Sequence, residues 1–163
     1  MQNKQSAEHI NYKLRDVIGS DIVLLFEWVN DNQVRGNSIN NQPISFGEHT
    51  EWFNEKINSP ICKMFILEIN NEPAGQIRFE FNDIERVWEI DYSISKKFRG
   101  LGLGKLIVKK SIHLVNQFSF AAYVKEDNIR SQNVFSGLGF TNMGLHKIKN
   151  TKLLKYFKVQ SNE

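Results

Sequence analysis

A cluster of three glycines constrains the fold of this chain more than any other part of its sequence. Gly100, Gly102 and Gly104 stand between an apolar, strand-like run (88–94) and a run with helical spacing (106–118). Glycine permits a tight turn, and bare backbone lets a ligand approach the amide groups at the start of a helix. Those amides and the positive end of the helix dipole favour an anion such as phosphate. The sequence therefore predicts a strand, an anion-binding loop and a helix in succession.

The spacing of the glycines excludes two common nucleotide-binding loops. A Gly-x-Gly-x-x-Gly dinucleotide loop needs a third glycine at position 105 or 107, where lysine and isoleucine stand. A P-loop needs glycine where Arg99 stands, and serine or threonine where Leu106 stands. The pattern that remains is Arg99-x-x-Gly102-x-Gly104. A turn that binds nothing is the alternative, and Lys105 argues against it, because a cation in the first helical turn opposes the helix dipole unless an anion offsets it.

The composition indicates a single globular domain. The chain has 163 residues, of which 40% are hydrophobic and 12% aromatic, enough for a sizeable core. We expect a frayed tail over 1–10 and one domain over 11–160. The net charge of +3, without a basic run interleaved with aromatic residues, gives no case for nucleic-acid binding.

Cysteine content and hydropathy suggest where the chain resides. Cys62 is the single cysteine, which excludes an intrachain disulfide and suggests a reducing compartment. We find no apolar stretch of signal-peptide or transmembrane length. We therefore expect a cytoplasmic protein that does not bind a membrane, as a monomer or a homodimer.

Hydrophobic periodicity and capping residues predict alternating strands and helices. Asp21 is expected to cap one helix, a Ser45–Glu48 capping box to open the next, and Gly139 to end the last in the left-handed conformation. The polar interval 30–43 is expected to be a loop. The predicted elements are a strand at 12–17, helices at 21–30 and 45–58, strands at 62–69, 74–81 and 87–94, a helix at 106–118, a strand at 119–124, a helix at 128–138 and a hairpin at 143–148 and 152–159.

The motif Arg99-x-x-Gly102-x-Gly104, followed by Asn128-x-x-Ser131 and Gly139-Phe140, resembles the GNAT superfamily of acetyl-CoA-dependent N-acetyltransferases. The resemblance extends over about 11–157. It implies an α/β (α+β) fold with a central mixed, mostly antiparallel sheet of six to seven strands, flanked by four helices and splayed at the strand before the loop. It also implies acetyl-CoA as co-substrate and no metal. The histidines, in agreement, lack the paired spacing of metal ligands.

The resemblance further implies which residues hold acetyl-CoA. Strand 87–94 would pair with the pantetheine arm, the glycine loop would bind the pyrophosphate, and the last helix would face the arm from the other side. The residues are Tyr92, Ile94 and Ser95 for the arm, Arg99, Gly100, Leu101, Gly102, Leu103, Gly104 and Lys105 for the pyrophosphate, and Asn128 and Ser131 opposite. Asn128 could equally be a plain helix N-cap.

The implied reaction is direct attack of a neutral amine on the thioester, for which a carboxylate would remove the amine proton. Glu80, Glu89 and Asp91 are the carboxylates close in sequence. Glu89 is the preferred base, because a carboxylate within an otherwise apolar strand needs a reason. The alternative is that Glu89 pairs with an arginine, Arg78 or Arg86.

The proton donor for the leaving thiolate is open. Many GNAT enzymes have a tyrosine four residues before the Gly-Phe pair, where this chain has Phe135. Either another group such as Tyr123 donates the proton, or the thiolate leaves unassisted with help from the helix dipole. Phe135 also keeps open a non-catalytic module that binds acetyl-CoA.

The acceptor is suggested by the segments 27–53 and 75–79, which resemble the N-acetyltransferases of pseudaminic acid biosynthesis. Those enzymes acetylate the 4-amino group of UDP-4-amino-4,6-dideoxy-N-acetyl-β-L-altrosamine. The acceptor-binding residues expected on this basis are Arg35, Asn37, Ser38, His49, Trp52, Phe53, Gln76 and Arg78.

Each of these acceptor residues has a physical role and an alternative. Arginine can bind phosphate as a fork, the aromatic side chains can stack on uracil, and amides can bind sugar hydroxyls. Trp52 and Phe53 could instead be core residues, Arg78 could face solvent, and His49 could pack at a helix N-terminus. A protein N-terminus or a polyamine is the competing acceptor, although Arg35 and Arg78 oppose a cationic one.

Overall fold

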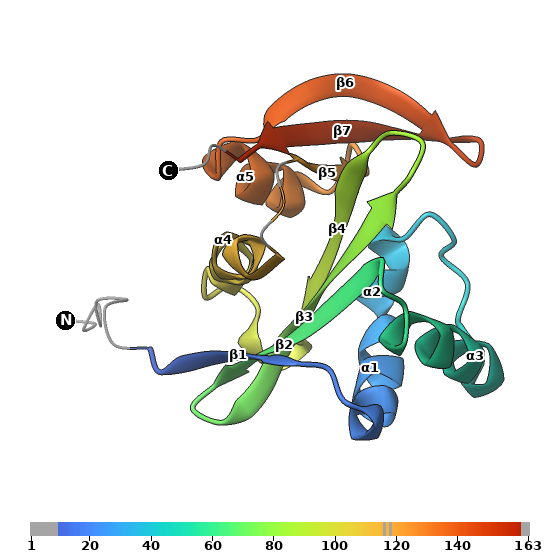
Figure 1. The fold of residues 1–163 in the computed structure, drawn as a ribbon, viewed down its shortest axis with the longest axis vertical. Coiled ribbons are helices and arrows are strands. Elements are labelled where there is room, and N and C mark those ends of the chain that lie inside the picture. The colour runs from blue at the N-terminus through green and yellow to red at the C-terminus, as the bar shows by residue number, and fades with distance from the viewer. Residues whose placement is uncertain (1–9, 116, 118, 161–163) are drawn as a thin grey trace.

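Seven strands form one sheet in the order β1-β2-β3-β4-β5-β7-β6 (Figure 1). The computed structural model describes residues 10–115, 117 and 119–160, so the tail expected over 1–10 lies almost wholly outside the described residues. All neighbouring strands are antiparallel except β4 and β5, which are parallel. The strands are β1 (Tyr12–Asp16), β2 (Cys62–Ile69), β3 (Glu72–Asn82), β4 (Val87–Ile94), β5 (Ser119–Val124), β6 (Thr141–Ile148) and β7 (Thr151–Val159).

Helices cover both faces of the sheet, as Figure 1 shows with α4 on one side and α1 and α3 on the other. Alternate residues of β2 account for this: Phe65 and Leu67 belong to the core beneath α4, whereas Met64 and Ile66 belong to the core beneath α1 and α3. The α-helices are α1 (Ile22–Val29), α2 (Asn32–Asn37), α3 (Phe46–Ile57), α4 (Leu103–Val115) and α5 (Ile129–Gly137).

The capping predictions have different outcomes at the first two predicted helices. The Ser45–Glu48 capping box opens α3, with the Glu48 amide donating to the Ser45 hydroxyl at 3.3 Å and the Ser45 amide donating to the Glu48 carboxylate at 2.9 Å. Asp21 precedes α1, but its side chain makes no cap, so that prediction was wrong. Its carboxylate instead accepts hydrogen bonds from Arg15 on β1, at 2.8 and 2.9 Å.

The structure corrects the expectation of a loop over 30–43, because this interval contains α2 as a fifth α-helix among the described residues. The Asp31 carboxylate caps α2 by accepting from the amides of Gln33 (3.0 Å) and Val34 (3.3 Å). Tertiary contacts fix both ends of this short helix. Arg99 binds Asp31 at 2.5 Å, and the Lys125 ammonium donates to the Gly36 carbonyl at 2.7 Å.

The splay expected next to the glycine loop is present between β4 and β5. These two strands pair only at Trp88 with Phe120 and at Glu89 with Ala121. Beyond Glu89, β4 keeps its pairing with β3 as far as Ile94, while β5 diverges from it. The edge of β4 that faces the divergence is therefore available to a ligand.

The C-terminal half of the domain follows the sequence pattern closely. Gly139 has φ +78°, and the Phe140 amide donates to the Phe135 carbonyl at 3.0 Å, which is the hydrogen-bonding pattern of a left-handed helix end. Lys149 and Asn150 both have positive φ, as a two-residue turn between β6 and β7 requires. The hairpin predicted at this place is confirmed.

Candidate active site

Two cavities adjoin along β4. The first, of about 490 Å³, lies at the splay between β4, β5, the glycine loop, α2 and α5. The second, of about 590 Å³, lies between α1, α2, α3 and the sheet. The residues that line both cavities are Val34, Asn37, Ser38, Ile90, Asp91, Ser93 and Tyr123. A ligand in one cavity can therefore reach a ligand in the other beside Asp91 and Ser93.

The glycine loop has the backbone conformation that anion binding requires. Gly100 and Gly102 have φ of +81° and +77°, which residues with a side chain rarely adopt. In α4 the Leu106 amide donates to the Gly102 carbonyl at 3.3 Å, so the amides before Leu106 are free of helical bonds. These amides and the helix dipole have the features that suit an anion at the end of the first cavity.

Most residues expected to hold acetyl-CoA line this first cavity. They are Tyr92, Ile94, Arg99, Gly100, Gly102, Leu103, Gly104, Lys105, Asn128 and Ser131. Two expected residues lie outside its wall. The Ser95 amide donates to the Ala74 carbonyl at 2.8 Å and is used by the sheet, and the Leu101 side chain is 61% exposed.

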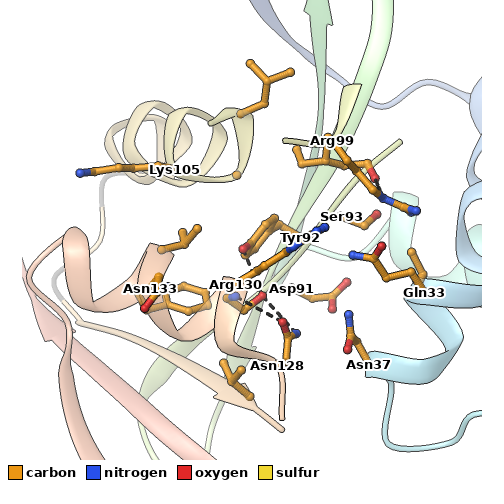
Figure 2. A pocket seen from close by; sticks show the side chains of 18 of the residues that line it. Gln33, Asn37, Asp91, Tyr92, Ser93, Arg99, Lys105, Asn128, Arg130 and Asn133 are labelled. Atoms are coloured by element: carbon orange, nitrogen blue, oxygen red, sulfur yellow. Dashed lines mark hydrogen bonds between the residues drawn. The ribbon is translucent and has the colours of Figure 1, made fainter. Parts of the chain in front are cut away.

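The two cations of the loop point away from each other (Figure 2). The Arg99 guanidinium donates to the Ile94 carbonyl at 2.9 Å and to the Asp31 carboxylate, and it thereby joins the loop to α2. Burial raises the pKa of Asp31, but the hydrogen bonds from Arg99 and from the α2 amides outweigh burial, so that this pKa is lowered. The Lys105 side chain is exposed and extends along α5 near Gly137. The backbone amides at the start of α4 are therefore the donors of the loop that have no protein partner in common with these two cations.

Asn128 is a helix N-cap, as one of the two readings of the sequence expects. Its Oδ1 accepts from the Ser131 amide at 3.3 Å, and its Nδ2 donates to the Ser131 hydroxyl at 3.2 Å. The Tyr92 hydroxyl lies 3.1 Å from the same Ser131 hydroxyl. The three side chains form one hydrogen-bonded group across the splay, from β4 to the first turn of α5 (Figure 2).

Glu89 and Asp91 lie two residues apart on β4, and both line the second cavity. Glu89 accepts a hydrogen bond from Asn82 at 2.6 Å. The arginines considered as its partners are engaged elsewhere: Arg78 with Glu80 at 3.5 Å and Arg86 with Asp83 at 3.2 Å. Asp91 is exposed, lines both cavities, and is 3.3 Å from the Gln76 amide nitrogen.

Two aromatic residues bear on the open question of the proton donor. The Tyr123 hydroxyl donates to the Glu85 carboxylate at 2.9 Å, and burial together with Glu85 raises the pKa of Tyr123. Phe135 is 2% exposed and packs against Tyr92, Phe140 and Tyr156. Phe135 lines the first cavity, so its ring rather than a hydroxyl faces the cofactor space.

The residues expected to bind the acceptor line the second cavity with one exception. Phe53 is 2% exposed and lines neither cavity. It is a core residue, as the alternative interpretation expects. His49 is also buried: its Nε2 lies 2.9 Å from the Ile22 carbonyl at the start of α1, as the packing alternative expects. The residues in the wall are Arg35, Asn37, Ser38, His49, Trp52, Gln76 and Arg78.

The two arginines of this wall differ in what their guanidinium groups contact. Arg35 donates to the carbonyls of Val29, Asn40 and Gln42 at 2.6, 3.0 and 3.3 Å and to the Ser38 hydroxyl at 3.0 Å, so it stabilises the segment after α2. Arg78 lies over the Trp52 ring, with Cζ 5.2 Å from the ring centroid. Burial lowers the pKa of Arg35, which still remains a cation.

Several residues of the site were not predicted. Gln33 and Asn133 line the first cavity, and Asp31 binds Arg99 of the glycine loop. All three come to the site only because the fold brings their segments next to β4 and the loop. Figure 2 shows Gln33 and Asn37 of α2 on the side of the cavity opposite Asn133. The role of Asp31 as a helix cap could have been predicted, because aspartate is a common N-cap residue. Its contact with Arg99 could not, because the two residues are far apart in the sequence.

The described residues contain neither a cluster of metal ligands nor a membrane-spanning helix. Within the described residues, no three histidine, cysteine, aspartate or glutamate side chains lie together in a way that could hold a metal ion. None of the helices described in the structure is long and apolar enough to cross a membrane.

The fold is similar to those of solved acetyltransferases. The spermidine N-acetyltransferase from Vibrio cholerae, in complex with CoA and spermine, superposes with a TM-score of 0.79 at 18% identity, over 91% of this chain and 95% of that one. The aminoglycoside acetyltransferase AAC(6')-Ib with coenzyme A gives 0.79 at 18% identity, over 92% and 95%. The ribosomal L7/L12 α-N-protein acetyltransferase RimL with coenzyme A gives 0.74 at 20% identity, over 91% and 93%.

Sequence comparisons place the chain in a family. A search of curated protein sequences found no significant match. The family model described as "Acetyltransferase (GNAT) family" matches residues 25–140, which include the splayed strand, the glycine loop, α4 and α5. Because this match covers most of the chain and includes the elements around the first cavity, the chain belongs to the acetyltransferase (GNAT) family and is an acetyl-CoA-dependent N-acetyltransferase.

Proposed function

We propose that this enzyme transfers acetyl from acetyl-CoA to the 4-amino group of a UDP-linked amino sugar, as in pseudaminic acid biosynthesis. The observation that supports this acceptor is the make-up of the second cavity. Its wall combines aromatic and aliphatic side chains with amide, hydroxyl and guanidinium groups, and it meets the first cavity at Asp91 and Ser93. A nucleotide sugar has matching parts: a flat base, a diphosphate, hydroxyl groups and methyl groups.

The nucleotide part of this acceptor would lie against Trp52 and Arg78. The ion pair of Arg78 with Glu80 uses the Nε atom, and the guanidinium carries further donors that suit a phosphate. The Trp52 ring is stacked with His49 at a centroid distance of 5.6 Å, which fixes its orientation for contact with a base. Arg35 lines the same cavity, and its donors are bonded to backbone carbonyls, so the proposal assigns the phosphate contact to Arg78.

The sugar part would lie toward β4. The Gln76 amide is within 3.4 Å of the Ser93 hydroxyl and next to Asp91, so it can donate to a sugar oxygen at the junction of the cavities. Ile44 and Met64 provide apolar wall for the 6-methyl and N-acetyl methyl groups. The 4-amino group would then point at the thioester in the first cavity.

A small cationic amine is a second candidate, because four carboxylates line the second cavity: Glu48, Glu80, Glu89 and Asp91. The arginines that opposed a cationic acceptor are both engaged, Arg35 with backbone carbonyls and Arg78 with Glu80. The solved spermidine and aminoglycoside acetyltransferases share this fold.

Release of free thiol from acetyl-CoA distinguishes the acceptors. The panel consists of the UDP-linked 4-amino sugar, the same sugar without UDP, spermidine, kanamycin and a peptide with a free N-terminus. We expect the UDP-sugar to give the highest kcat/KM, and Arg78→Lys to lower it toward that of the UDP-free sugar, since lysine lacks the planar fork. Preference for spermidine or kanamycin would select the second candidate, and preference for the peptide would contradict both.

A further inference from the structure

Tyr92 is a phenol in the first cavity that the expected mechanism leaves without a chemical role. It is one of two tyrosines in the wall of this cavity, the other being Tyr123. Tyr92 projects from β4 toward the start of α4 and α5, on the strand face opposite Asp91 and Ser93. A Cβ atom added to Gly104 would lie 3.1 Å from its Cε2 and 3.3 Å from its hydroxyl oxygen. The ring is thus held closely between the glycine loop and α5.

The position of the two cavities separates the acid from the base of the reaction. In the proposed reaction the acceptor amine enters from the second cavity, and the sulfur of the thioester lies on the side of the first. A proton donor for the thiolate should therefore line the first cavity only, and a base for the amine should line the second. Tyr92 lines the first cavity only, whereas Tyr123 lines both.

The cationic groups and the second phenol in the wall of the first cavity are less suitable proton donors than Tyr92. The guanidinium groups of Arg99 and Arg130 do not release a proton at any working pH. The Lys105 ammonium extends along the outside of α5. The Tyr123 proton is donated to Glu85, whose carboxylate also binds Lys155.

We infer that Tyr92 protonates the thiolate of coenzyme A as it leaves. The amine nitrogen attacks the thioester carbon and loses its proton to a carboxylate and from there to solvent. The C–S bond then breaks, the sulfur keeps the electron pair, and the Tyr92 O–H proton moves to sulfur. Ser131, 3.1 Å from the Tyr92 oxygen, donates a hydrogen bond to the phenolate and relays a proton from water that restores the phenol.

The surroundings of Tyr92 keep its hydroxyl protonated before each turnover, as a proton donor requires. Burial raises the pKa of Tyr92 and outweighs the opposite effect of the hydrogen bond with Ser131. The phenol is consequently neutral throughout the neutral pH range. The Asn128 amide donates to the Ser131 hydroxyl at 3.2 Å, which orients Ser131 to donate toward the Tyr92 oxygen.

Phe135 provides a direct test of this role. Its ring centroid lies 5.9 Å from that of Tyr92, with the rings edge to face, and both residues line the first cavity. A tyrosine introduced at 135 would bring a hydroxyl into the same cavity from α5. The inference rests on acetyl transfer at this site and not on the identity of the acceptor, so any amine that the wild type acetylates serves in the test.

The test compares Tyr92→Phe, the double variant Tyr92→Phe/Phe135→Tyr and the control Tyr12→Phe, whose residue on β1 lines neither cavity. We expect Tyr92→Phe to lower kcat by about 10²-fold, with the Kd for coenzyme A within about twofold of wild type by calorimetry. The double variant should have a kcat at least about tenfold higher than that of Tyr92→Phe. The control Tyr12→Phe should retain the wild-type kcat. A kcat within about threefold of wild type in Tyr92→Phe, or a greater loss in Tyr123→Phe, would overturn the inference.

A second donor keeps the test decisive if the double variant does not fold. S-acetyl-4-nitrothiophenol has a strongly acidic leaving thiol that needs no proton to depart. With this donor we expect Tyr92→Phe to lose less than about threefold, against about 10²-fold with acetyl-CoA. An equal loss with both donors would show that Tyr92 acts only through packing.

Discussion

The guanidinium of Arg99 and the carboxylate of Asp31 form an ion pair at 2.5 Å that joins the glycine loop to α2 across 68 residues of sequence. Both side chains are largely shielded from solvent, with 17% and 23% exposed. The pair therefore holds the glycine loop against α2, and Arg99 itself lines the first cavity.

Two variants of this ion pair distinguish a positioning role of Arg99 from direct contact of its guanidinium with phosphate. Arg99→Ala should weaken coenzyme A binding about tenfold, or about 1.4 kcal/mol, because α2 loses its link to the loop. The charge swap Asp31→Arg/Arg99→Asp should recover part of this affinity, measured by calorimetry. A swap that binds more weakly than Arg99→Ala would mean that the guanidinium contacts the ligand directly.

Gly102→Val should weaken coenzyme A binding by at least about 10²-fold. The substitution adds a branched side chain at φ +77° beside the amides of the anion site. Gly47→Ala is the matched control, because Gly47 lies in α3 with no atom within 4 Å of an added Cβ and no positive φ. Unchanged affinity in Gly102→Val would show that the pyrophosphate binds elsewhere.

Glu89→Gln should depress kcat/KM for the amine more at neutral pH than at high pH, where the free amine is abundant and needs no base. Asp91→Asn is the matched comparison, since Asp91 lines both cavities and Glu89 only the second. Full pH–rate profiles of both variants decide between them. A loss in Glu89→Gln that is the same at every pH would exclude Glu89 as the base.

We expect the buried His49 to lower the free energy of unfolding at acidic pH. Burial lowers the pKa of His49, and the contact with the Ile22 carbonyl offsets burial only in part. The unfolded chain therefore binds the proton more readily, so His49 contributes stability that is complete above about pH 6.5 and is lost as pH falls toward the lowered pKa. His49→Gln should flatten this part of the Tm–pH curve between pH 7 and 5. An unaltered slope would assign the pH dependence to other groups.

Gly75→Ala should destabilise the domain and disturb the site together. An added Cβ would lie 2.8 Å from the Ser93 carbonyl oxygen and 2.8 Å from Ile94 Cδ1, at the end of β4. Such overpacking costs about 1–3 kcal/mol, which corresponds to a fall in Tm of about 3–10 °C for a domain of this size. Gly19→Ala is the control, with no atom within 4 Å of its added Cβ. Equal Tm values for the two variants would contradict the close approach.

The order of strands and helices was predictable because it rests on local patterns. The Ser45–Glu48 box, the Asn128 cap and the Gly139 helix end each satisfy backbone groups within a few residues, so their signals are complete in the sequence. The prediction for Asp21 was wrong, because Arg15 on the neighbouring β1 offers its carboxylate two hydrogen bonds that no local pattern shows. The helix α2 was missed, since a segment of six residues is too short to show periodicity.

The sequence by itself determined a glycine loop between a strand and a helix, with the features of an anion site, because backbone conformation and helix amides follow from the residues in that segment alone. Tertiary structure decided what each charged or aromatic side chain near the site contacts. Arg35 and Arg99 line the two cavities, but their hydrogen bonds go to backbone carbonyls and to Asp31 in other segments, and Phe53 lies in the core. Tyr92 was brought to Ser131 from 39 residues away. Side-chain partners depend on which strands and helices come together, and no local pattern contains that information.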